Sequence, residues 1–123
     1  MNLASNVNFF LGLQTQLKIN HWQTKGYARH MAFGQTYDDL GLLIDAFVES
    51  AMGKYGRFVM TEDEKTLELV NLSEVNPKDM IATSINVLEE FSSQIDGKDT
   101  ELLNIRDEMI ASLSKLQYLL TLE

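Results

Sequence analysis

The chain has 123 residues, 45% of them hydrophobic, and a formal net charge of −8 at pH 7. This length and apolar content predict a single domain, residues 1–123, built around one core. Cysteine is absent, which excludes disulfides, thiolate catalysis and cysteine-ligated metal sites. The acidic balance disfavours a nucleic-acid partner, and no apolar stretch is long enough to cross a membrane. The N-terminus lacks the charged and apolar regions of a signal peptide.

Two amphipathic helices are predicted in the first half of the sequence. Over residues 3–24 apolar side chains recur at spacings of three and four, and Gly26 is expected to end the helix. Over residues 30–53 a second apolar stripe repeats with the same period, and Gly53 and Gly56 are expected to end it.

The second half begins with a shorter predicted helix. Thr61 and Glu64 have the spacing of a capping box, which predicts a short helix over residues 61–72. Asn76 and Pro77 predict the start of a third long helix, closed by Gly97. A last helix, capped by Asp99 or Thr100, is expected to continue to residue 120, because its leucines recur with the spacing of a bundle seam.

These elements predict an all-α fold. No segment shows the period of two that indicates a strand. Short first and third connections, with a longer second one, favour a ferritin-like four-helix antiparallel bundle. A long crossover containing the short helix would join helices two and three.

The second predicted helix has an unusual polar arc. Its members fall within an arc of about 100°: His30, Gly34, Asp38, Gly41, Asp45 and Glu49. Glycine within a helix costs on the order of 1 kcal/mol relative to alanine. The glycines therefore predict the close approach of another helix at this face.

The same arc contains potential metal ligands. Asp45 and Glu49 are one turn apart, so both carboxylates face one way and can bind a hard cation or a ferrous ion. His30 lies about 22 Å along the axis from Asp45, too far for one ion. A two-fold-related copy with an antiparallel helix would bring the two together, forming two equal sites, and His21 would add a second nitrogen.

Ordinary structural roles also fit these residues. Asp45 and Glu49 are typical of a solvated helix face, and a histidine beside Trp22 is typical of a packed or capping residue. Asp38 and Asp39 are typical surface charges. Five methionines are interpreted as core residues: Met31, Met52, Met60, Met80 and Met109.

A resemblance to a known family adds to this interpretation. Residues 21–26, His-Trp-Gln-Thr-Lys-Gly, resemble the His-Trp-x-x-Lys-Gly segment of the Dps (DNA-protection-during-starvation) branch of the ferritin superfamily. Residues 30–49 are similar to that family's second helix without a gap, and residues 99–120 are more loosely similar to its last helix. Small phage-encoded Dps-like proteins, which have no known activity, are similar as well.

The resemblance implies a function and an assembly. It implies a mono- or di-iron ferroxidase site shared across a two-fold dimer interface, with ligands His21 and His30 from one chain and Asp45 and Glu49 from the other. It also implies dimers that assemble into a larger cage, located in the cytoplasm of a bacterial host cell or, for a phage structural protein, in the virion.

The sequence also departs from the family pattern. Gly34 stands where the family has an Asp or Glu ligand, and Asp38, one turn on, is a candidate replacement. The connection between His21 and His30 is shorter than in the family, and the basic DNA-binding tail of some Dps proteins is missing. The alternative is therefore a structural or interaction protein, for example a virion or assembly component, that keeps the bundle without ferroxidase activity.

Overall fold

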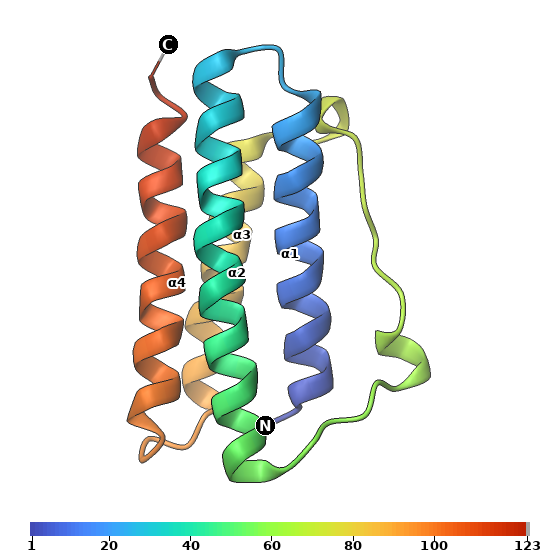
Figure 1. The fold of residues 1–123 in the computed structure, drawn as a ribbon, viewed down its shortest axis with the longest axis vertical. Helices are drawn as coiled ribbons and strands as arrows, with labels where there is room; N and C mark the ends of the chain where they lie inside the picture. The colour runs from blue at the N-terminus through green and yellow to red at the C-terminus, as the bar shows by residue number, and fades with distance from the viewer. Residues whose placement is uncertain (123) are drawn as a thin grey trace.

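A computed structural model describes residues 1–122, which form four α-helices and three short 3₁₀ turns (Figure 1). The helices are α1 (Leu3–Gln23), α2 (Tyr27–Tyr55), α3 (Pro77–Glu90) and α4 (Thr100–Leu119), and the turns are η1 (Glu62–Glu64), η2 (Leu72–Glu74) and η3 (Phe91–Ser93). The predicted all-α class is confirmed. No helix in the described part of the chain has the length and hydropathy needed to span a membrane.

The four long helices pack side by side in a bundle. In Figure 1, α1 and α4 run upward while α2 and α3 run downward, so α2 and α3 are parallel. The crossover of residues 56–76 makes this possible by returning along the full length of the bundle beside α1. Direct helix contacts join α1 to α2, α2 to α4 and α3 to α4.

An aromatic cluster forms one end of the core. Phe10 of α1, Phe47 of α2 and Phe91 after α3 are each at most 1% exposed. Their ring centroids lie 5.2 to 6.2 Å apart in tilted or edge-to-face arrangements. Such pairs add about 0.5–1.5 kcal/mol beyond the burial of their area. The cluster therefore fixes how the two helical hairpins pack against each other.

The observed ends of two helices differ from the predicted ones. Helix α2 begins at Tyr27 rather than near residue 30, and it continues past Gly53 to Tyr55. Gly56 ends it with a φ of 87°, a conformation that favours glycine. Helix α3 starts at Pro77 with the Asn76 side chain as its cap, as predicted. It ends at Glu90 rather than at Gly97, because the chain tightens into η3.

The predicted helix over residues 61–72 is not formed. Thr61 makes no capping hydrogen bond, and only the short turns η1 and η2 are present. Between them, side chains of α1 bind the crossover backbone: Asn8 contacts the carbonyl oxygen of Thr66, and Gln16 contacts Val70. These tertiary hydrogen bonds use backbone groups that a local helix would need for itself.

Candidate functional site

Two histidines meet where α1 turns into α2. His21 lies in the last turn of α1 and His30 in the first turn of α2, joined by the short connection of residues 24–26. Their rings stack with centroids 3.8 Å apart and planes inclined by 20°. The short connection therefore brings the two predicted nitrogen ligands together.

The histidine pair is locked by reciprocal hydrogen bonds. His21 Nδ1 lies 2.6 Å from the carbonyl oxygen of His30, and His30 Nδ1 lies 2.8 Å from that of His21. A carbonyl oxygen only accepts, so each Nδ1 carries the hydrogen and donates it. In a neutral ring with its hydrogen on Nδ1, the other nitrogen, Nε2, keeps a free lone pair. Within residues 1–122, neither Nε2 has a hydrogen-bond partner.

This lock also has a structural role. The carbonyl of His21 belongs to the last turn of α1, where backbone oxygens lack partners within the helix. The His30 ring satisfies that oxygen and so caps α1. The same histidine can cap a helix and bind a metal. Metal-binding histidines commonly bind the ion through one ring nitrogen and donate a hydrogen bond from the other to a carbonyl oxygen.

Gly34 makes room for the His21 ring. A Cβ at position 34 would lie 2.8 Å from His21 Nδ1 and 2.9 Å from its Cε1, closer than real Cβ contacts. At Gly41 a Cβ would lie 2.9 Å from Nε2 of Gln14. Both glycines thus face side chains of α1, which accounts for the close approach expected at this helix face.

The two predicted carboxylate ligands lie elsewhere on α2. Asp45 and Glu49 are exposed, and within residues 1–122 neither makes a hydrogen bond or an ion pair. They lie about 22 Å along the helix from His30. Asp38 is about 12 Å from His30 along the axis, too far to replace a carboxylate at position 34. In the described part of one chain, no three His, Asp or Glu side chains gather closely enough to hold a metal ion.

Two large apolar side chains share this side of α2 with the carboxylates. Met31 is 52% exposed and Leu42 is 74% exposed, on the same side of α2 as Asp45 and Glu49. The interpretation of Met31 as a core residue is therefore wrong.

The single tryptophan lies beside the histidine pair. Trp22 is 68% exposed, and Lys18 places its ammonium 5.4 Å from the Trp22 ring and 4.7 Å from the Tyr37 ring. Such cation–π contacts contribute about 0.5–1 kcal/mol at exposed sites. Trp22 is thus a built-in fluorescent reporter next to His21.

Comparison with known proteins assigns a family. The sequence profile of a family of unknown function, DUF5856, matches residues 21–120. The chain belongs to this family. It is also 28% identical over 123 residues to an uncharacterized 14.6 kDa protein from the mobD-ri intergenic region of Enterobacteria phage T4, covering 97% of this chain and 91% of that protein. No solved structure matches significantly.

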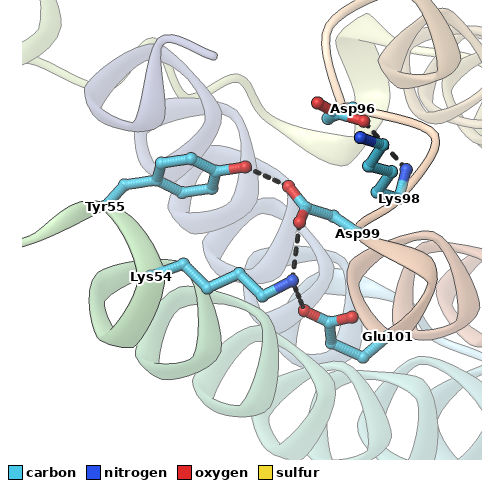
Figure 2. A network of polar contacts seen from close by, with 6 residues as sticks. All are labelled: Lys54, Tyr55, Asp96, Lys98, Asp99 and Glu101. Carbon is cyan, nitrogen blue, oxygen red and sulfur yellow. Dashed lines mark hydrogen bonds and ion pairs between the residues drawn. The ribbon is translucent and has the colours of Figure 1, made fainter.

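In this DUF5856 chain, a second polar cluster lies at the far end of α2 (Figure 2). Lys54 Nζ is 2.6 Å from Oδ1 of Asp99 and also pairs with Glu101, while the Tyr55 hydroxyl donates to Oδ2 of Asp99. Asp99 occupies the N-cap position of α4, but its side chain makes no capping bond there. The predicted position of the cap is confirmed, but the Asp99 carboxylate binds α2 instead of the helix backbone.

The cluster changes the protonation of its members. A hydrogen bond from Lys54, and a weaker contribution from the Tyr55 hydroxyl, lower the pKa of Asp99. The hydrogen bond from Lys54 also lowers the pKa of Glu101. The same contacts raise the pKa of Lys54 and that of Tyr55. The cluster thus fastens the last turn of α2 to the start of α4 and holds both carboxylates ionised.

We expect Asp99→Asn to change how stability depends on pH. The ordinary pKa values of Asp99 and Glu101 are 3.8 and 4.5, and both are lower in the fold. Their contribution is therefore complete above about pH 5 and is lost as the pH falls through the folded pKa values. Asp99→Asn should lower the melting temperature at pH 7, with a smaller difference at pH 3. Asp107→Asn, which removes the pair between the exposed Asp107 carboxylate and Arg106, is the control and should change little. Equal losses at both pH values would contradict the assignment.

Proposed function

We propose that this protein binds ferrous iron at sites shared between two copies of the chain, and that it oxidises the bound iron. The observation that carries the proposal is the reciprocal lock of His21 and His30, which fixes both rings and leaves both Nε2 atoms without a partner. Asp45 and Glu49 of a second copy supply the carboxylates. Imidazole and carboxylate together suit iron among the divalent metals.

The geometry of α2 supports the shared site. If His30 of one copy lies level with Asp45 and Glu49 of the other, the two α2 helices run antiparallel about a two-fold axis near Asp38. The exposed Met31 and Leu42 then become covered by the second copy. The parallel α2 and α3 with a long crossover are also the arrangement of ferritin-like bundles, which supports the Dps-like assignment.

The stacked rings favour two ions rather than one. A ring nitrogen binds a metal in the plane of its ring, about 2.1 Å away. With planes inclined by only 20° and centroids 3.8 Å apart, one ion cannot lie in both planes. Each imidazole therefore holds its own ion. Two ferrous ions supply the two electrons that reduce one peroxide, with two protons, to two water molecules.

A second candidate function is a structural or interaction role without iron chemistry. The capping of α1 by His30 favours it, because this contact gives the histidine a use that needs no metal. Gly34, in place of the usual family carboxylate, also favours it. The phage T4 relative is compatible with a phage protein acting in the host-cell cytoplasm or in the virion.

An anaerobic ferrous titration tests the proposal. We expect Trp22 fluorescence to change until two ions are bound per chain, and peroxide to produce ferric iron afterwards. Sedimentation at micromolar concentration should show a dimer or a larger assembly, since the monomer lacks a complete site. A stable assembly that binds no iron would favour the structural role, and a monomer that binds iron would refute the shared site.

A further inference from the structure

A stretch of the crossover is held along α1 by its backbone. The Asn8 side-chain amide donates to the carbonyl oxygens of Glu64 and Thr66 at 2.9 and 2.8 Å. Gln16 makes two hydrogen bonds to the backbone of Val70. Its Nε2 donates to the Val70 carbonyl oxygen at 2.9 Å, and its Oε1 accepts from the Val70 nitrogen at 3.0 Å. Because these contacts are made to backbone atoms, they fix the path of residues 66–70 along α1.

The spacing of these contacts indicates an extended conformation. Four residues of extended chain, from Thr66 to Val70, span about 13 Å. Asn8 and Gln16 lie about 12 Å apart along the axis of α1. The agreement means that residues 66–70 run nearly straight beside the helix, as Figure 1 also shows.

One backbone edge of this stretch has no partner in the part of the chain that the structure describes. In an extended chain, the polar groups of alternate residues point to the same side. Because Thr66 and Val70 face α1, Leu67 and Leu69 present theirs to the other side. Within residues 1–122, the backbone groups of residues 67–69 make no hydrogen bond. The stretch therefore has the open edge of a strand at a sheet margin.

A groove on the α1 side of this stretch combines apolar walls with negative charge. It lies between the crossover, α1 and α3, and its apolar lining includes Phe9, Leu67 and Met80. Its charged lining residues are Asp63 and Glu68, and no Lys or Arg lines it. Leu69, on the same stretch, is 42% exposed. Along the stretch itself, the partly exposed Leu67 and Leu69 alternate with the acidic Glu68, which suits a strand that alternates apolar and basic side chains.

We propose that residues 66–70 are a docking strand for an extended segment of a partner protein that alternates basic and apolar side chains. Main-chain hydrogen bonds to Leu67 and Leu69 would add the segment as a neighbouring strand, with its basic side chains beside Glu68 and its apolar side chains beside the two leucines. A second copy of this chain fits poorly, because antiparallel self-pairing about Glu68 places two like charges opposite each other. This surface is separate from the candidate iron site.

A short fluorescent peptide of alternating lysine and valine is a direct probe. At low salt, its fluorescence anisotropy should rise on addition of the full-length protein. Two peptides separate strand addition from simple charge attraction: one with the same sequence and N-methylated backbone nitrogens, and one with glutamate in place of lysine. Both should bind at least tenfold more weakly. Equal binding by the N-methylated peptide would overturn the proposal.

Leu69→Pro tests the docking strand itself. It removes one backbone donor that has no partner within residues 1–122. Loss of one net hydrogen bond should weaken peptide binding about fivefold to tenfold. Val59→Pro makes the same change elsewhere in the crossover, where the side chain is 81% exposed, and should leave binding unchanged. Equal affinities for both variants, or no peptide binding by the unmodified protein, would refute the docking strand.

Discussion

Replacing Asp45 and Glu49 together by alanine should abolish ferrous-iron binding while leaving the fold intact. Both side chains are exposed and make no hydrogen bond or ion pair within residues 1–122, so the free energy of unfolding should change by less than about 0.5 kcal/mol. Anaerobic titration followed by Trp22 fluorescence measures the binding, and thermal unfolding measures the stability. Glu89→Ala with Glu90→Ala, two exposed carboxylates on α3, is the control and should bind iron normally.

Mixing two defective variants tests whether the site is shared. A chain with His21→Asn and His30→Gln keeps the carboxylates, and a chain with Asp45→Ala and Glu49→Ala keeps the histidines. After subunit exchange at equal concentrations, half of the dimers contain one chain of each kind, and each mixed dimer has one complete site. About a quarter of the iron-binding capacity should return. No recovery, despite mixed dimers shown by mass, would mean that the ligands do not come from two chains.

The sequence was sufficient to predict the four long helices, because their apolar periodicity agrees with their packing. The cap at Asn76 and Pro77 is local, and the structure has it where it was expected. The helix predicted over residues 61–72 failed for a non-local reason. Asn8 and Gln16, more than fifty residues earlier, bind the backbone of that stretch in an extended form. Propensity and capping patterns contain no information about such contacts.

The candidate site was predictable only in part. The spacing of His30 and Asp45 along one helix already requires a second copy for any shared ion. Lys54 and Asp99 were not predicted as partners, because they are 45 positions apart in the sequence and Asp99 resembles an ordinary helix cap. Gly34 was interpreted as a missing ligand. The structure gives it a steric role as well, since only glycine leaves space for the His21 ring.

Gly34→Ala should weaken ferrous binding about 10–100-fold with little change in stability. The new Cβ would lie 2.8 Å from His21 Nδ1, so the ring has to move and lose its bond to the carbonyl oxygen of His30. Loss of a partner that orients a ligand typically lowers metal affinity by about this factor. The lost hydrogen bond costs about 1 kcal/mol. Alanine restores about 1 kcal/mol of helix propensity, so the two effects on stability nearly cancel.

Gly53→Ala separates the ring displacement from the general effect of alanine in α2. Position 53 lies in the same helix, and a Cβ there meets no atom within 4 Å. This variant should gain up to about 1 kcal/mol of stability and bind iron as the unmodified protein does. If Gly34→Ala also bound iron normally, the orientation of His21 would be irrelevant to the metal. The histidine lock would then serve only to cap α1, and the structural role would be the better account of this protein.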